Sequence, residues 1–282
     1  VAHTENGQVL VLDKGRYRAL WTVDAALPLV VARQDTAQSI AFAAPDGNLT
    51  VFDASGATLL SLSGSGRPVE LKLSPDGANF VYSVRRSDGY ALWIVDASGI
   101  VTGHAELTQM PVFAPAFGGW RALAGGDLLH IAPDGSITTI AQGITPSPGR
   151  LAQMHVDRAG TTYIYFGDSG RTLMAIDSAG IVRWRERFVG SIDAAPLLAT
   201  DTGCLLYMLD AAGTLTAFDA LTGQPITVRD LYPGGVDTRR LSGRLLEVDA
   251  QNRVTVNPGF LSTVTFDGAV LGAGVLDGCL LG

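Results

Sequence analysis

A short phrase recurs along this chain: an apolar strand, an aspartate in the turn that follows, and a glycine before the next strand. Successive glycines of the phrase are separated by 41, 43, 36, 45 and 43 residues. The copies are Val9–Gly15, Leu49–Gly56, Leu92–Gly99, Leu129–Gly135, Leu173–Gly180 and Leu215–Gly223. A period near forty residues that contains only strand and turn signals is typical of folds in which each repeat forms one small sheet.

Each repeat can be divided into four short strands. The clearest repeat has its strands at Ala194–Thr200, Cys204–Met208, Thr214–Phe218 and Gln224–Val228. Such strands are too short to be stable alone, but stacked sheets of three or four bury a continuous core. The sequence therefore predicts an all-β chain that forms a single β-propeller domain over residues 1–282, with seven four-stranded blades. Six and eight blades are the alternatives.

The last part of the chain allows two registers. Its third strand lies either at Leu245–Asp249 or at Val264–Gly268, and both choices give seven repeats of about 40 residues. The chain begins in what reads as a third strand and ends on the apolar pattern Cys279–Gly282. We therefore expect the N-terminal and C-terminal strands to share one blade and close the ring, which removes an exposed sheet edge.

Composition and charge exclude several classes of function. The 47% hydrophobic and 17% charged residues suit many short buried strands, and no apolar run is long enough for a membrane-spanning helix. The net charge is −7, so we do not expect nucleic-acid binding. The densest basic stretch, Arg183–Arg187, alternates like a strand and is interpreted as a solvated sheet edge. Because Val1 leads almost directly into strand pattern, we expect a processed chain or a piece of a longer precursor, as after removal of an export signal.

Motifs for metal, cofactor or nucleophilic chemistry were sought and none was found, so we predict no cofactor and no metal. Cys204 and Cys279 are interpreted as free buried thiols, because similar positions in non-adjacent blades lie too far apart to bridge. His155 is expected on an inner strand, either as a structural histidine or as a side chain that lines the axial channel. Most aspartates fall in turns, which favours a structural use.

The repeats resemble those of PQQ-type, or quinoprotein-like, propellers. The resemblance rests on a proline at the first strand, an aspartate–glycine turn and a tryptophan in the fourth strand, as in Asp177–Trp184. One repeat, at Ser74-Pro75-Asp76-Gly77, is similar instead to TolB-type and WD40-like propellers. The resemblance implies quinoprotein dehydrogenase activity as the enzyme alternative. The adjacent cysteines found in many such enzymes are missing here, and no catalytic residue can be carried over.

Loops that do not repeat are then the candidates for function. Aromatic and apolar residues among prolines suit a protein contact, and the candidate partner-binding residues are Met110, Phe113, Phe117 and Tyr232. The alternative for the two phenylalanines is ring packing beneath a loop. We expect a non-enzymatic scaffold that binds a protein partner, similar to BamB-type assembly propellers, in the periplasm, on the cell surface or secreted. The alternatives are a subunit of a larger extracellular or redox assembly, and a channel-site enzyme or ligand binder of quinoprotein type.

Overall fold

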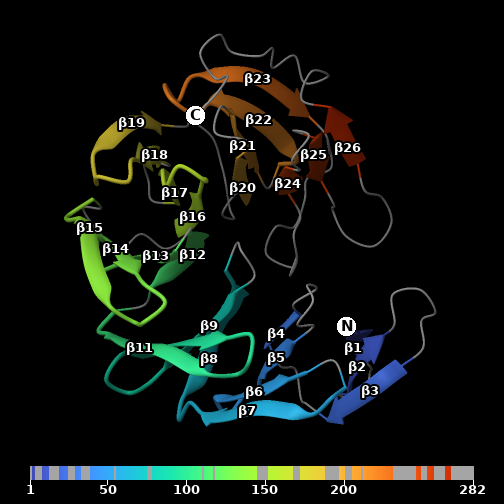
Figure 1. Cartoon of the computed structure of the whole chain (residues 1–282). Helices are drawn as coiled ribbons and strands as arrows, with labels where there is room; N and C mark the ends of the chain where they lie inside the picture. Colours follow the sequence, from blue (N-terminus) through green and yellow to red (C-terminus); the bar gives the residue numbers. More distant parts are fainter. Residues whose placement is uncertain are drawn as a thin grey trace. The chain divides into compact units, whose positions relative to one another are not determined.

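The computed structural model of this chain consists of β-strands joined by turns throughout its described part (Figure 1). It describes residues 2–3, 8–12, 19–24, 29–32, 39–53, 55–74, 78–109, 111–116, 118–144, 152–167, 172–187, 197–200, 205–210, 212–230, 246–248, 253–256 and 264–267. None of these segments forms a helix of the length and apolarity needed to cross a membrane.

Five four-stranded sheets form in the described residues, and each keeps its strands in the order of the sequence. The first two consist of β4 (Leu29–Ala32), β5 (Ile40–Ala43), β6 (Asn48–Phe52) and β7 (Thr58–Ser63), and of β8 (Arg67–Leu73), β9 (Asn79–Arg85), β10 (Tyr90–Asp96) and β11 (Val101–Leu107). The third consists of β12 (Val112–Ala116), β13 (Gly119–Ala124), β14 (Asp127–Ile131) and β15 (Ile137–Ala141). The last two consist of β16 (Ala152–Val156), β17 (Thr162–Phe166), β18 (Thr172–Ile176) and β19 (Val182–Arg187), and of β20 (Leu197–Thr200), β21 (Leu205–Leu209), β22 (Thr214–Asp219) and β23 (Pro225–Asp230).

Two three-stranded sheets come from the two ends of the chain. They consist of β1 (Ala2–His3), β2 (Gln8–Leu12) and β3 (Ala19–Asp24), and of β24 (Leu246–Val248), β25 (Arg253–Val256) and β26 (Val264–Asp267). From the sequence we expected the chain to begin in the third strand of a blade. In the structure a further strand, β1, precedes β2 and pairs with it. A strand of two residues is too short to leave a periodic pattern in the sequence.

The prediction of four short antiparallel strands per repeat is confirmed for five sheets. The repeat chosen from the sequence as the clearest one forms β20–β23, whose neighbours pair antiparallel. At the C-terminal end the second of the two registers is observed, because β26 follows β24 and β25 as the third strand of its sheet. The first strand of that sheet, β24, packs against β20, the first strand of the preceding sheet.

Burial differs between the middle and the outer strands. Every residue of β17, β18 and β21 is buried, whereas the outer strands β7, β11, β19 and β23 carry exposed residues along their lengths. Strands that are buried on both faces read as nearly continuous apolar runs, and this is the pattern seen in β17, β18 and β21. The outer strands meet water, so they carry more exposed polar and charged residues than these middle strands do.

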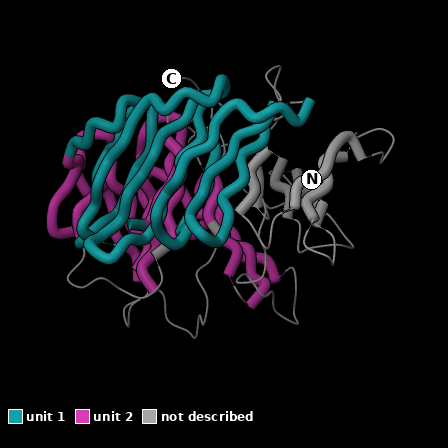
Figure 2. The backbone as a smooth tube through the Cα atoms, turned by 90° about the horizontal axis from the view of Figure 1, so that it is seen from below, with its two compact units in different colours: residues 1–111, 117–125, 129–138 teal, residues 112–116, 126–128, 139–282 magenta. Residues whose placement is uncertain are grey.

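The backbone divides into two compact units, coloured separately in Figure 2. Unit 1 comprises residues 1–111, 117–125 and 129–138, and unit 2 comprises residues 112–116, 126–128 and 139–282. Within unit 1 the first strands β4 and β8 pack together, and within unit 2 the first strands β12, β16, β20 and β24 pack in succession.

Each unit has a core formed between two sheets. In unit 1 it lies between the β4–β7 and β8–β11 sheets and contains Ala41, Ala43, Leu49, Val51, Leu71, Phe80, Tyr82, Val84, Ala91, Trp93 and Val95. In unit 2 it lies between the β16–β19 and β20–β23 sheets and contains Tyr163, Tyr165, Leu173, Ala175, Trp184, Leu198, Leu206, Met208, Phe218 and Ala220. Each short sheet is thus stabilised by the apolar face of a neighbouring sheet.

Candidate functional site

The aspartate of the repeated phrase holds the turn between the third and fourth strands. Asp96 Oδ1 accepts hydrogen bonds from the Ser98 amide at 2.9 Å, the Ser98 hydroxyl at 2.7 Å and the Ile100 amide at 2.9 Å. Asp53 and Asp177 accept equivalent amide bonds from the residues two and four positions later. These carboxylates are therefore acceptors of local backbone hydrogen bonds, which is the structural use predicted for them.

The backbone of the same turn explains the glycine. The Gly99 amide donates to the Asp96 carbonyl at 3.1 Å, and the Asp96 amide donates to the Ile100 carbonyl at 2.9 Å. Gly99 has φ +84°, and the register of the hairpin shifts between Ile94 and Val95. This is a three-residue hairpin loop with a β-bulge, in which glycine occupies the left-handed position.

Hydrogen bonding also lowers the pKa of two turn aspartates, Asp53 and Asp96. The side chain of Ser55 and the backbone amides of the turn hold the pKa of Asp53 below its usual value. Burial alone would raise the pKa of Asp96, but the bonds from Ser98 and Ile100 lower it overall. A carboxylate with a lowered pKa that is saturated by donors is a poor general acid or base near neutral pH.

The turn glycines also touch the outer strand of the preceding sheet. A Cβ atom on Gly223 would lie 2.6 Å from ring atoms of Trp184, and one on Gly180 would lie 2.0 Å from the Ile140 carbonyl oxygen. A Cβ atom on Gly135 would lie 2.5 Å from the His104 backbone nitrogen, and one on Gly99 would lie 2.9 Å from Leu59 Cβ. The same residue thus permits the turn and the close approach of two sheets.

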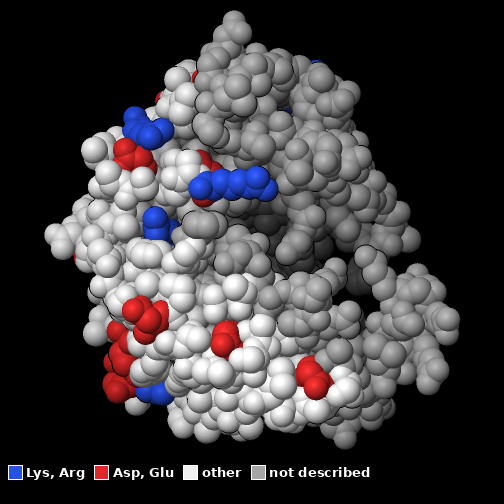
Figure 3. Space-filling model, in the orientation of Figure 1, with Lys and Arg blue, Asp and Glu red and all other residues white. Residues whose placement is uncertain are grey.

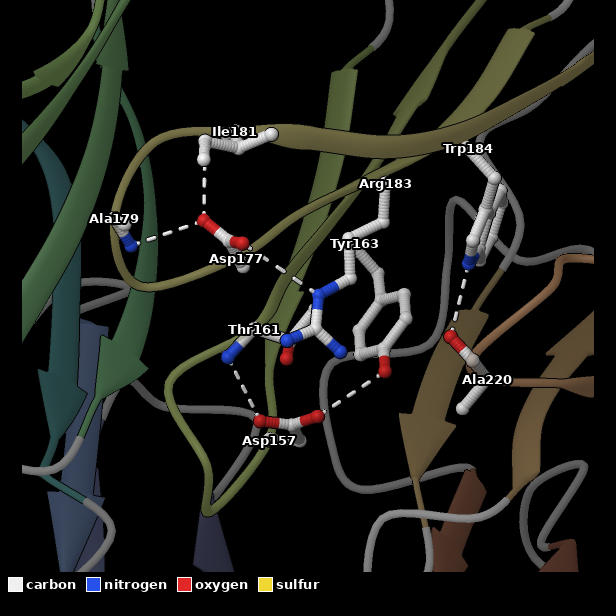
Figure 4. A network of polar contacts seen from close by, with 9 residues as sticks. All are labelled: Asp157, Thr161, Tyr163, Asp177, Ala179, Ile181, Arg183, Trp184 and Ala220. Atoms are coloured by element: carbon white, nitrogen blue, oxygen red, sulfur yellow. Dashed lines mark hydrogen bonds and ion pairs between the residues drawn. The ribbon is translucent and has the colours of Figure 1, made fainter.

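Figure 4 shows polar contacts of the β16–β19 sheet, including the one that Trp184 makes with the next sheet. The Trp184 indole Nε1 donates to the Ala220 carbonyl at 2.9 Å. Asp157 accepts from the Thr161 amide at 2.8 Å and from the Tyr163 hydroxyl at 3.1 Å. Burial raises the pKa of Tyr163, and the neighbouring Asp157 adds to this, so the phenol stays protonated and donates. The network holds loops and sheets together through neutral donors and one carboxylate.

His155 lies on β16, an inner strand as predicted. Its Nε2 contacts the Thr200 hydroxyl on β20 at 2.9 Å, so the ring links the first strands of two adjacent sheets. Burial lowers the pKa of His155 to about 4, and Asp157 only partly opposes this. The imidazole is therefore neutral at physiological pH, in keeping with a structural contact.

Two polar contacts in unit 1 were not expected from the sequence. Arg121, which is buried, contacts His130 on the adjacent strand through Nη1 and Nδ1. Burial and the Arg121 charge lower the pKa of His130. The sequence signal for this contact is the hairpin turn at Gly125-Gly126. Arg121 and His130 are equidistant from that turn, and such residues face each other across the two strands of a hairpin.

The second unexpected group surrounds Trp93. The Arg86 guanidinium carbon lies 5.2 Å from the centre of the Trp93 ring, and the His104 ring lies 5.3 Å from it. Arg86 Nη1 and His104 Nε2 both approach Glu106 Oε1 at 3.0 Å. The cluster covers an aromatic ring with charged side chains on the outer part of the β8–β11 sheet.

The four candidate partner-binding residues lie mostly outside the described residues: Met110, Phe117 and Tyr232 are not described. Phe113 lies in β12, and only 1% of its surface is exposed. In this conformation its ring is part of the interior, as the ring-packing alternative expects, and it is not offered to a partner. The partner-binding role of the other three stays a prediction.

The described part of the chain contains no assembled metal site of protein side chains. No group of three or more His, Cys, Asp or Glu side chains there is arranged to hold a metal ion. Cys204 and Cys279 lie outside the described residues. On the face shown in Figure 3, acidic and basic side chains are scattered over a mostly uncharged described surface.

Comparison with solved structures places the chain in a class: its fold is similar to that of β-propellers. BamB from Moraxella catarrhalis superposes with a TM-score of 0.58 at 15% identity, over 90% of this chain and 74% of that one. Hsv2 from Kluyveromyces lactis superposes with a TM-score of 0.62 at 11% identity, over 89% of this chain and 83% of that one. Sqt1 from Saccharomyces cerevisiae gives 0.61 at 15% identity, over 90% and 76%.

The family follows from a sequence match. The PQQ_2 family model, described as outer membrane protein assembly factor BamB, matches residues 77–226, more than half of the chain. The chain belongs to this family, and the resemblance to PQQ-type repeats is confirmed. The search of curated proteins gives no match.

Proposed function

We propose that this chain is a non-enzymatic scaffold that binds another protein in the cell envelope or outside the cell. The observation that carries the proposal is membership of the family described as outer membrane protein assembly factor BamB. A protein of that description acts through assembly with other proteins. Periplasmic, cell-surface or secreted location is proposed on the same basis.

The local chemistry supports this proposal. The turn aspartates Asp53, Asp96 and Asp177 accept backbone hydrogen bonds, and His155 contacts a threonine of the adjacent sheet. These groups stabilise the sheets and their junctions, and the non-repeating loops and outer strands are left as recognition surfaces. We further propose one domain over residues 1–282 with seven blades, with six or eight as alternatives, closed by strands from both ends of the chain.

A crosslinking experiment tests the proposed function. The tagged chain is expressed in its source organism, crosslinked in intact cells and purified, and the bound proteins are quantified by mass spectrometry. We expect one protein partner in near-equal molar amount, and none with an unrelated exported protein that carries the same tag. Absence of a stoichiometric partner would overturn the proposal.

The enzyme alternative has its own readout. The purified chain is loaded with PQQ and calcium and given alcohols and sugars with an artificial electron acceptor. We expect no reduction of the acceptor above that of PQQ and calcium alone. Turnover above this background would establish a quinoprotein-type enzyme in place of a scaffold.

Protease accessibility in intact cells and in cells with a permeabilised outer layer tests the location, because a cytoplasmic chain would be protected in both.

A further inference from the structure

Strand β19 forms the outer edge of the β16–β19 sheet. It pairs with β18 along one side, and no other strand in the described residues pairs with its other side. An edge strand presents backbone N–H and C=O groups that can pair with an additional strand. This edge is therefore a geometrically suitable place for an extended peptide segment to bind.

Three arginines project from this edge strand at alternate positions. Arg183, Arg185 and Arg187 are all exposed, whereas Trp184 between them is buried. Alternate residues of a strand lie on one face, about 6.6–6.8 Å apart. Arg185 and Arg187 lie on the regular part of the strand, so their spacing matches alternate residues of a neighbouring extended chain. Arg183 is the extra residue of a β-bulge and lies outside this regular spacing.

The contacts of these arginines within the chain are weak. Arg183 Nε lies 3.7 Å from Asp177 Oδ2, and Arg185 Nη2 donates to the Ile144 carbonyl at 3.5 Å. The Arg187 side chain has no hydrogen bond or ion pair with the described part of the chain. Exposed ion pairs of such length contribute little to stability, so most of the charge is open to a partner.

Other outer strands do not share this charge. β7 and β15 contain no charged residue, β11 contains only Glu106, and β23 contains one of each sign, Arg229 and Asp230. The chain as a whole has a net charge of −7. A basic row on one outer strand of an acidic protein is complementary to an acidic segment.

We propose that β19 binds an extended, acidic segment of the partner protein as an added strand, with acidic residues at alternate positions opposite Arg185 and Arg187. This inference rests on the proposed protein-binding function and names the chemistry of its partner. Cross-strand pairs of opposite charge are favourable and like charges opposite each other are unfavourable.

A labelled peptide of alternating threonine and glutamate, long enough to span β19, tests the proposal by fluorescence anisotropy at low salt. Three control peptides accompany it: alternating threonine and lysine, the same composition with the glutamates in one block, and the alternating peptide with N-methyl groups on alternate amides. Of the four peptides, we expect only the alternating acidic peptide to bind the chain. The N-methylated peptide keeps the charge but cannot complete the strand hydrogen bonds.

The protein variant is Arg185→Glu with Arg187→Glu, and the matched control is Arg229→Glu on the outer strand β23. Circular dichroism and thermal melting establish that each variant is folded. We expect the double variant to bind the acidic peptide at least about tenfold more weakly and to gain affinity for the lysine peptide. We expect the control variant to bind as the unchanged chain does. The gain for the lysine peptide cannot arise from misfolding.

Several results would overturn the inference. These are no binding of the alternating peptide, equal binding of the N-methylated or block peptide, and binding of anionic phosphatidylglycerol vesicles without binding of the peptide. If the double variant still co-purifies with a stoichiometric partner while the peptide fails to bind, this inference is wrong and the proposed function stands. If the unchanged chain has no partner in cells, the proposed function itself is wrong.

Discussion

Because it lacks a Cβ atom, the glycine of the repeated turn meets two requirements, a positive φ and the close approach of a neighbouring sheet. At Gly223, φ is +75°, a conformation that strains other residues, and the space for a Cβ is filled by the Trp184 ring. The sequence indicated the first requirement, because aspartate and glycine at fixed offsets are turn residues. The second depends on a residue 39 positions earlier in the chain, and only the structure shows it.

Comparison of two glycines separates these requirements. Gly118 has φ +70° and nothing within 4 Å of its would-be Cβ, so Gly118→Ala carries backbone strain alone. Gly223→Ala carries the same strain and also a clash with Trp184. We expect the free energy of unfolding, measured by urea titration, to fall by about 1–3 kcal/mol more in Gly223→Ala than in Gly118→Ala. Equal losses would show that the sheets separate freely at this contact.

His155 makes the stability of the protein depend on pH. Its pKa is about 4 in the folded chain, below about 6.5 for an unfolded chain, so the unfolded chain binds more protons between these values. The free energy of unfolding should therefore fall by about 1–3 kcal/mol as the pH decreases from about 6.5 to about 4.

Urea titrations across this pH range check the prediction. His155→Gln keeps a polar partner for Thr200 without an imidazole, and we expect it to show a smaller decrease than the unchanged chain. The remaining decrease comes in part from His130, whose pKa is also lowered in the folded chain. His104→Gln also removes one histidine, and we expect it to retain the decrease because His155 is still present. An unchanged pH profile in His155→Gln would contradict the assignment.

At the scale of elements, the strand pattern is readable in the sequence because the sheets are alike. Buried runs such as those of β17 and β18 begin with a threonine and are otherwise apolar or aromatic, and each is followed by a turn signal. The junctions between sheets are not readable in this way. The bond from Trp184 in β19 to the Ala220 carbonyl spans 36 positions and depends on the distance between two sheets.

Two tryptophans test the strength of that junction. Trp184→Phe removes a buried hydrogen bond and leaves the Ala220 carbonyl unpaired, which should cost about 1–3 kcal/mol beyond the smaller ring. Trp120 is also buried, but its Nε1 has no hydrogen-bond partner among the described residues, so Trp120→Phe removes a donor that is unsatisfied there. We expect the larger loss of thermal stability for Trp184→Phe. A larger loss for Trp120→Phe would assign the stability to ring volume instead of the hydrogen bond.

At the scale of the whole molecule, seven sheets and two compact units are described, and a single domain is a proposal. Trp120 lies in unit 1 and Trp184 lies in unit 2, so they report on each unit separately. In two variants that keep one of these tryptophans and carry phenylalanine elsewhere, we expect unfolding by fluorescence and by circular dichroism to coincide. Coincident transitions are the mark of one cooperative unit. A fluorescence midpoint that departs from circular dichroism in either variant would indicate two domains.

Candidate sites were harder to predict than the fold. The sequence placed His155 on an inner strand and treated the aspartates as turn residues, both from local pattern. It offered Phe113 as a partner contact because prolines flank it, yet that residue is buried in β12. A strand with prolines near its ends and a loop with exposed rings have similar local composition, and burial by other parts of the chain distinguishes them.

The sequence by itself determined the repeat, the four-stranded sheets and the family. Strand period and turn chemistry are local properties of the sequence, and they recur in each repeat. Tertiary structure alone decided which outer strand meets which turn glycine, that Arg121 faces His130, and that the arginines of β19 stand on an open edge. The physical reason is that contacts between sheets depend on the separation and orientation of packed layers. A local sequence pattern does not carry that information.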